Sequence, residues 1–288
     1  MQEQKTGKEK FLSNLRKDNV FVDSKIVSLS DLTGMPVVNG ISRAIISEGQ
    51  IVHAVSDIYQ HLPNEKYFYE IEAAMIEADI NYEVQSTNRD NCNFAVDYIL
   101  NDYKFNIDVK NTKDRIIPML RFTNSYNGGI ISGHFGYFRE LCTNGLHIAQ
   151  TRTGFKVLHR PGGVELVIPN IKKLVEVFMS NEYYSLSKKF EVLAETPIKD
   201  LSEFVKFTCT KLDLFKYEKS EKNPDEPSKT AQIVIDTINR EAGIVGVEPN
   251  LWLGYNAFNE HIHNCKKGFS NQRKTDIELF STVMGMAN

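Results

Sequence analysis

Alternating apolar and polar positions dominate the first two thirds of the chain. The segment 50–60 alternates as an extended strand, and the apolar spacing after Pro63 predicts a helix that begins at Asn64. A further extended run begins at Tyr82. These elements predict a strand, a helix and a second strand before residue 93.

Three consecutive hairpins are predicted next. Residues 93–111 alternate on both sides of a turn at Asn101-Asp102, which predicts two paired strands. Residues 116–138 form a second pair, joined through Tyr126 to Gly129, because Asn-Gly favours a hairpin turn. Residues 154–169 reverse around a Pro-Gly-Gly turn as a third pair. This succession predicts an antiparallel β-meander.

After Pro169 the apolar period changes to that of helices. Residues 171–181 and 201–215 are amphipathic, and further helices are predicted in the segments 229–241, 250–265 and 274–286. The segment 216–229 carries many charges, two prolines and almost no apolar residues, which is typical of a linker. The fold class expected is α+β, an antiparallel β-meander core with packed helices and a helical C-terminal third.

The same pattern gives the expected domain organisation. Residues 1–22 are expected to be a flexible tail, residues 23–170 a sheet-rich α+β core, and residues 171–288 a helical region containing the charged linker 216–229. The polar N-terminus lacks the apolar centre of a secretory signal, and no run is long enough to span a membrane. We expect a cytoplasmic protein with no membrane partner.

The composition is that of a globular protein, with 41% apolar and 25% charged residues. The four cysteines are scattered without a CxxC pair, which favours reduced thiols over disulfides or a zinc site. His261 and Cys265 share a helix face, but two further ligands are missing for a closed site. We therefore expect no metal and no cofactor.

Net charge is −3, but it is unevenly distributed. Residues 1–100 carry 9 basic and 15 acidic residues, whereas residues 101–173 carry 11 basic and 5 acidic ones. The middle of the chain is therefore basic, which suits a polyanionic ligand. The simpler alternative is that these charges only solvate a surface.

Common catalytic motifs are missing from the sequence. It contains neither a phosphate-binding GxxxxGK[ST] loop nor a GxSxG nucleophile turn. Cys142 and His147 are close in sequence, but a catalytic pair is defined in space, and Cys142 lies between Leu141 and Thr143 as a small apolar residue would. No catalytic residue is assigned.

Nucleic-acid binding suits the basic middle better. Phosphate requires Lys and Arg, and single-stranded bases stack on aromatic side chains. The candidate nucleic-acid-binding residues are Lys104, Lys110, Arg121, Arg139, Arg152 and Tyr137. For any aromatic residue here, burial in the sheet is the commoner alternative.

Three blocks of sequence resemble a known family. They are AVSDIYQHLPNEKYF (54–68), TNSYNGGIISGHFGYFRELCTNGL (123–146) and LWLGYNAFNEHIHN (251–264). They are similar, in the same order, to blocks of the phage/plasmid-like protein family catalogued as domain of unknown function 932. The matching positions are Ser56, Asp57, Tyr59, Gln60, Asn64, Asn124, Ser125, Gly128, Arg139, Cys142, Asn144, Asn256 and Glu260. His61 and Gly129 depart from the pattern.

The resemblance implies a protein of phages, plasmids and other mobile elements, and it brings no catalytic residues. The leading hypothesis is a non-enzymatic DNA-metabolism accessory protein that binds single-stranded DNA, with a role in recombination or annealing. The order of a basic meander and helices is also that of single-strand annealing recombinases, a likeness of fold alone. Such recombinases assemble as oligomers, so a second copy of the chain is an expected partner.

Two alternatives stay open. The first is a module that binds a host or phage protein, as an antagonist of host defence or an assembly factor. The second is an enzyme acting on a nucleotide, in which Asn124, Ser125, Arg139, Cys142, Asn144 and His147 would surround one pocket.

Overall fold

The computed structural model describes residues 20–37, 40–109, 112–139, 145–146, 154–179, 182–265 and 269–287. The chain divides into two compact units. Unit 1 comprises residues 1–102, 119–135 and 150–180, and unit 2 comprises residues 103–118, 136–149 and 181–288. The boundaries fall inside strands β7 (Thr112–Ser125) and β8 (Ile130–Arg139), so each of these strands contributes to both units.

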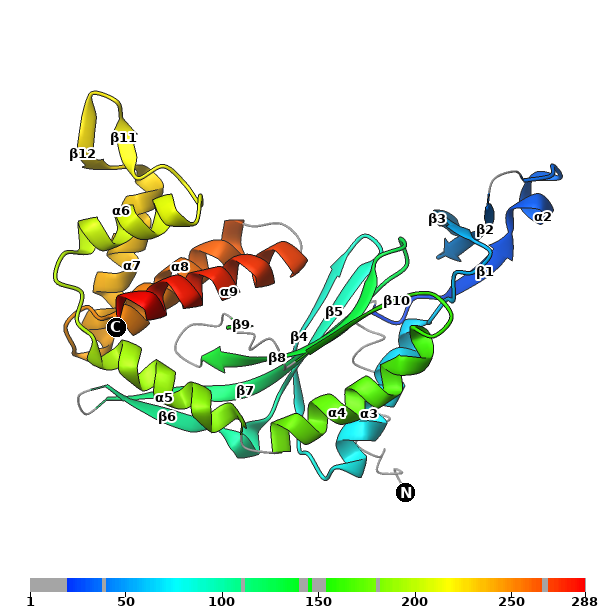
Figure 1. Ribbon diagram of the computed structural model, residues 1–288, viewed down its shortest axis with the longest axis horizontal. Coiled ribbons are helices and arrows are strands. Elements are labelled where there is room, and N and C mark those ends of the chain that lie inside the picture. Colours follow the sequence, from blue (N-terminus) through cyan, green and yellow to red (C-terminus); the bar gives the residue numbers. More distant parts are fainter. Residues whose placement is uncertain are drawn as a thin grey trace, which may run out of the picture. The chain divides into compact units, whose positions relative to one another are not determined.

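Unit 1 begins with a small antiparallel sheet in the order β1 (Ser24–Ser28), β2 (Ile41–Ser47) and β3 (Gln50–Ser56). The short helix α2 (Leu29–Thr33) connects β1 with β2 (Figure 1). Glu48 and Gly49 join β2 to β3 with φ angles of 50° and 77°, the left-handed turn that matches the twist of paired strands. A buried apolar cluster joins this sheet to the rest of the unit; it comprises Ile45, Val55, Tyr59, Phe94 and Tyr126.

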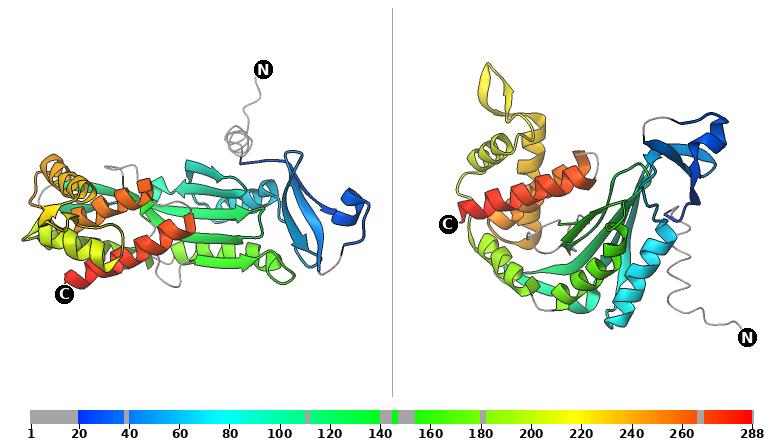
Figure 2. Two further views of the ribbon diagram at one scale, coloured as in Figure 1. Left: turned by 90° about the horizontal axis from the view of Figure 1, so that it is seen from above. Right: turned by 45° about the vertical axis from the view of Figure 1, so that its right-hand side comes forward.

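The large sheet of unit 1 has the strand order β10-β8-β7-β5-β4, with β4 (Glu83–Asp90), β5 (Asn93–Ile99) and β10 (Gly154–Leu158). Helices α3 (Asn64–Glu77) and α4 (Val167–Met179) pack side by side against it (Figure 2). Tyr67 of α3 meets Phe122 of β7 edge-on, with ring centroids 6.4 Å apart. Gly133 makes room for this packing, since a Cβ there would lie 2.5 Å from Phe155 and 2.7 Å from Phe122.

Unit 2 surrounds the remaining halves of β7 and β8. Strand β6 (Phe105–Val109) pairs with the start of β7, and β9 (Gly145–Leu146) pairs with the end of β8. The helices are α5 (Glu182–Glu195), α6 (Leu201–Lys211), α7 (Lys229–Val245), α8 (Leu251–Cys265) and α9 (Phe269–Met286). Helix α8 contacts α5, α7 and α9. Phe190 of α5 packs against Trp252 of α8 at a centroid distance of 4.9 Å, which forms the aromatic centre of the unit.

Local signals explain where the helices of unit 2 begin and end. The side chain of Asp200 accepts from Glu203 N at the start of α6, and that of Ser228 accepts from Ala231 N at the start of α7. Gly246, with φ of 75°, ends α7 in the left-handed conformation.

The α+β fold class is confirmed, and so are the helix that begins at Asn64 and the pairing of 116–138. The predicted hairpin 93–111 is wrong. Strand β5 pairs with β4 and with the second half of β7, whereas β6 pairs with the first half of β7. The 3-10 turn Asn101–Tyr103 connects these pairings without reversing the chain. Strand β7 can accept two successive partners because 14 residues extend over roughly 46 Å.

The third predicted hairpin is also wrong. Strand β10 forms its first arm, but the second arm becomes the 3-10 turn Val164–Leu166 and the first turn of α4. Val167, Ile171, Leu174 and Val175 are buried at helical spacing, and a proline in the first turn of a helix is tolerated. The segment expected to be a linker instead contains the hairpin of β11 (Glu218–Ser220) and β12 (Asn223–Pro227).

Candidate functional site

The two faces of the large sheet of unit 1 differ in chemistry. Phe94, Tyr98 and Phe122 alternate with residues on the opposite face and are buried on the side of α3. The strand register places Asp97 opposite Arg121 and Lys156 opposite Ser132 on the other face. We name the polar set on this second face the polar row: Ser86, Asn88, Asp97, Arg121, Thr123, Ser132 and Lys156.

Hydrogen bonds connect much of the polar row. Nε and Nη2 of Arg121 donate to the two carboxylate oxygens of Asp97, each at 2.5 Å. The Ser86 hydroxyl donates to Asp97 Oδ2 at 2.6 Å, and Asn88 Nδ2 donates to the Ser86 oxygen at 3.2 Å. The Arg121 guanidinium is therefore held in the bidentate geometry that also suits a phosphate.

The other end of the polar row lies toward the edge strand β10. The hydroxyls of Thr123 and Ser132 lie 2.6 Å apart, and Lys156 follows on the neighbouring strand. Lys156 is exposed, Thr123 is half-buried and Ser132 is buried. The row thus crosses the whole sheet and ends in an accessible cation.

The first two family-like blocks meet in unit 1. Asn124 Nδ2 donates to Asn64 Oδ1 and to the Leu62 carbonyl, each at 2.8 Å. Asn64 Nδ2 donates to the Val20 carbonyl at 2.7 Å, and Asn64 N donates to the Tyr126 hydroxyl, also at 2.7 Å. Both amide side chains are buried and paired, so they fix the start of α3 against the end of β7.

The backbone carbonyls of the turn after β3 converge on one side chain. The Arg43 guanidinium donates to the carbonyls of Ser56, Asp57 and Tyr59. It holds the turn together, and the Ser56 carbonyl also accepts from Tyr59 N at 3.2 Å.

Two histidines pack beside this turn. The ring of His159 stacks on Tyr59 at 4.9 Å, and His61 meets Tyr126 edge-on at 4.9 Å. Burial, together with the nearby His159, lowers the pKa of His61 to about 4. Burial also lowers the pKa of His159, so both rings are neutral near neutral pH.

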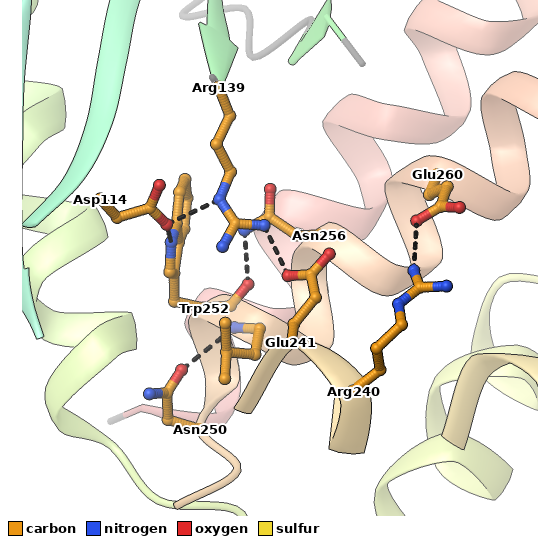
Figure 3. Close-up of polar contacts among 9 residues, drawn as sticks. Asp114, Arg139, Arg240, Glu241, Asn250, Trp252, Asn256 and Glu260 are labelled. Carbon is orange, nitrogen blue, oxygen red and sulfur yellow. Dashed lines mark hydrogen bonds and ion pairs between the residues drawn. The ribbon is translucent and has the colours of Figure 1, made fainter. Parts of the chain in front are cut away.

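In unit 2, Arg139 lies at the centre of a buried ion network (Figure 3). Its Nε donates to Asp114 Oδ2 and its Nη1 donates to Glu241 Oε2, each at 2.6 Å. The indole Nε1 of Trp252 donates to the same Asp114 oxygen at 2.8 Å, and the guanidinium carbon lies 5.7 Å from the indole centroid. Arg139 is 0% exposed, so this cation is enclosed by the protein.

The third family-like block contributes to the same network. Asn256 lies beside the Arg139 guanidinium, and its Nδ2 donates to the Trp252 carbonyl at 2.7 Å (Figure 3). Glu260, one turn further along α8, is half-buried and lies 3.6 Å from Arg240. The network connects β7, β8, α7 and α8 within unit 2, and its ion pairs join two acids to the single cation of Arg139.

The predicted nucleic-acid-binding residues fall into three groups. Lys104 is exposed, whereas Arg121 and Arg139 are buried in ion pairs. Tyr137 is buried with its ring 5.2 Å from Phe190. Lys110 and Arg152 lie outside the described residues, as do the family positions Cys142 and Asn144 and His147 of the enzyme alternative. Arg139 and Tyr137 would have to leave the interior to reach DNA, so we assign them structural roles.

Two further family positions lie at the tip of the β7–β8 hairpin. Ser125 is buried, and Gly128 has a φ of 78°. A Cβ on Gly128 would lie 2.8 Å from His53 Nε2, so both backbone conformation and space favour glycine.

The residues named for the enzyme alternative belong to different parts of the chain. Asn124 and Ser125 belong to unit 1 and Arg139 to unit 2, and the other three members fall outside the described residues. Across the described part of the chain, no group of three or more His, Cys, Asp and Glu side chains could hold a metal ion. In that same part, no helix has the length and apolar character needed to cross a membrane.

Comparison with known proteins gives one result. The family model "Domain of unknown function (DUF932)" matches residues 52–284. The chain belongs to this family. No curated protein matches the sequence, and no solved structure matches it.

The DUF932 match begins inside β3 and ends inside α9, so it contains the polar row and the Arg139 network. It does not reach β1, α2 or β2. The core of both units is therefore the family's domain, and the first strands of the small sheet lie outside the match.

Sequence reasoning missed two acids of the Arg139 network. Asp114 alternates with Ile116 on the buried face of β7, and Glu241 lies among Ile238, Ala242 and Val245 on the buried face of α7. An acid on an otherwise apolar face needs a buried partner, and this signal is readable from periodicity. The partner of both acids, Arg139, could not be read, because it lies 25 residues from Asp114 and 102 residues from Glu241 in the chain.

Proposed function

We propose that this DUF932 protein is a DNA-metabolism accessory protein of a phage or plasmid that binds single-stranded DNA without catalysing a reaction. It would act in the cytoplasm of a bacterial host, in recombination or strand annealing. The observation that supports the proposal is the polar row, a line of hydroxyl, amide and charged groups that crosses one face of the unit 1 sheet and ends in the exposed Lys156.

The polar row has the groups that a phosphate backbone needs. Phosphate oxygens accept from Lys and Arg, and from Ser, Thr and Asn side chains. Lys156 is exposed, and the half-buried Ser86, Asn88 and Thr123 offer neutral donors along the same face. Arg121 is buried in its ion pair with Asp97, so the exposed Lys156 is the cation of the polar row that a phosphate can reach.

The proposed binding is dominated by electrostatics. No aromatic residue belongs to the polar row, and Phe122 and Tyr98 point to the opposite face. Without base stacking from this face, affinity should depend little on sequence and strongly on salt.

The test is a fluorescence-anisotropy titration of a labelled single-stranded oligonucleotide of about 30 nucleotides. At about 50 mM salt we expect saturable binding, which weakens by at least about tenfold at about 200 mM because counterions are released. Lys156→Ala should weaken binding to all sequences and reduce the salt slope by about 1. Binding that is absent, or that does not change with salt, would contradict the proposal.

The matched control is Lys211→Ala. Lys211 is another exposed lysine, located at the end of α6 in unit 2, whereas the polar row belongs to unit 1. The control variant should bind the oligonucleotide as the unchanged protein does. Equal losses in the two variants would assign the binding to general charge instead of to the polar row.

A groove in unit 2 favours the protein-binding alternative. It has a volume of about 590 Å³ and lies between α6, the segment 196–200 and the ends of α8 and α9. Its apolar lining includes Phe204, Leu251 and Met286, and Phe207, which also lines it, is 51% exposed. Exposed aromatic side chains in apolar grooves are common at protein interfaces.

This alternative makes a different prediction for the same experiments. A partner held in the groove would remain bound after nuclease treatment and at high salt, and Phe207→Ser would release it. Lys156→Ala would leave such a complex unchanged. Release by nuclease would return the preference to DNA.

A further inference from the structure

The small sheet of unit 1 has an apolar face that the described residues cover only in part. Ile26 and Ile45 point into the buried cluster with Phe94, so their neighbours Val27 and Ala44 point to the outer face. Ala44 is buried there, but Ile41 and Ile51, toward the two ends of the β2–β3 hairpin, are 50% and 60% exposed.

Helix α2 is too short to cover this face. It has five residues and buries none of them. Leu32 is 44% exposed, and Met35 and Val37, which follow the helix, are 68% and 39% exposed. We name the set formed by Leu32, Met35, Val37, Ile41 and Ile51 the outer apolar surface.

The outer apolar surface is the densest group of exposed apolar side chains along the described part of the chain. Five of the fifteen large apolar side chains that are exposed there fall between residues 32 and 51. A monomeric protein rarely leaves such a patch in water, because each buried apolar group stabilises an interface.

Charge indicates what kind of partner fits. Among the acidic and basic side chains of the segment 24–56, Arg43 binds backbone carbonyls and Glu48 pairs with Arg89. The two that remain are Lys25 and Asp31, both exposed. A surface with one cation and one anion carries no net charge, which favours neither DNA nor an anionic membrane.

We infer that the outer apolar surface binds a second copy of this chain in a two-fold symmetric dimer. In such an interface each surface meets itself, so Lys25 of one copy can pair with Asp31 of the other, twice. The apolar residues then cover one another at the centre of the interface, with the two ion pairs at its rim. The inferred dimer goes beyond the proposed DNA binding, because it uses another face of unit 1. All five residues of the outer apolar surface precede the family match, which begins at residue 52 inside β3.

The first experiment is sedimentation velocity of the full chain over a range on the order of 1–50 µM. We expect a concentration-dependent dimer. Ile51→Lys places two buried lysines in each dimer and should weaken dimerisation by about 100-fold or more. Because Ile51 is exposed in the single chain, the variant should remain folded; Met35→Lys, at the most exposed position of the surface, provides a second test.

The matched control is Ile244→Lys on α7. Ile244 is 62% exposed, almost the same as Ile51, but it belongs to unit 2. The control variant should dimerise as the unchanged chain does. A monomer at all concentrations, a dimer that survives both Ile51→Lys and Met35→Lys, or an equal loss in Ile244→Lys would each overturn the inference.

A charge exchange tests the two-fold arrangement directly. Lys25→Glu alone and Asp31→Lys alone each place like charges opposite one another, so each variant should form a weaker dimer with itself. A mixture of the two variants should form heterodimers, because each acid of the first variant then meets a lysine of the second. Failure of the mixture to associate would overturn the proposed pairing.

Discussion

Replacement of Arg139 by methionine tests the most specific energetic feature of this structure. Arg139→Met keeps much of the side-chain volume but removes the only cation that contacts both Asp114 and Glu241 in the described network. Both carboxylates are nearly inaccessible, with side chains 2% and 4% exposed. Breaking a buried pair in this way leaves uncompensated charge and costs about 3–5 kcal/mol, so we expect a loss of about 4 kcal/mol in the free energy of unfolding.

The single tryptophan of the chain makes the measurement direct. Trp252 is a member of the network, so its fluorescence during urea unfolding reports on unit 2. With a urea dependence of about 2 kcal/mol/M, a loss of about 4 kcal/mol lowers the midpoint by about 2 M. Arg240→Met is the matched control, since Arg240 forms an exposed pair with Glu260 at 3.6 Å (Figure 3). It should cost at most about 0.5 kcal/mol.

Two results would refute this reasoning. The first is a loss below about 1 kcal/mol for Arg139→Met, or a loss equal to that of Arg240→Met. The second refuting result would come from the triple variant Arg139→Met, Asp114→Asn, Glu241→Gln. In this variant no charge remains buried, so we expect it to recover about half of the stability that Arg139→Met loses. A triple variant less stable than Arg139→Met would show that shape and hydrogen bonding, not charge, determine the stability.

Three further predictions concern unit 1. His61 has a pKa of about 4 in the folded chain, so between about pH 6.5 and pH 4 the unfolded chain binds a proton that the folded chain does not. The free energy of unfolding should therefore fall by about 2 kcal/mol as the pH is lowered over that range, after allowance for partial exposure. The fall should be smaller in His61→Phe. Gly133→Ala should destabilise by about 1–3 kcal/mol in thermal unfolding, because its Cβ would clash with Phe122 and Phe155. Asn124→Ala should cost about 2 kcal/mol by leaving the Leu62 carbonyl and Asn64 without a donor; a loss below about 0.5 kcal/mol would contradict that role.

Asp97 and Arg121 illustrate how the polar row could have been anticipated. Both residues alternate with apolar neighbours along their strands, so the sequence places each on the face opposite the aromatic residues. That they lie directly opposite one another depends on the register between β5 and β7, which are separated in the chain by β6. The predicted hairpin 93–111 assigned β5 a different partner, and with that error the pair could not be found.

Arg139 shows the opposite case. Its place in the basic middle of the chain indicated a surface cation, and only the structure shows it enclosed by acids from β7 and α7. Net charge counts residues without their environment, so a basic segment can contain cations that are neutralised by acids distant in sequence. The same holds for Tyr137, whose burial against Phe190 depends on α5, a helix the periodicity did not reveal.

The sequence by itself determined what depends on neighbours along the chain. Periodicity set the type of most elements, Pro63 and Asn64 located the start of α3, and the Asn-Gly turn joined β7 to β8. Tertiary structure decided what depends on distant partners, because hydrogen-bond registers and buried ion pairs form between segments that no local pattern connects. The pairing of β5 and β6 with separate halves of β7, and the enclosure of Arg139, were decided there.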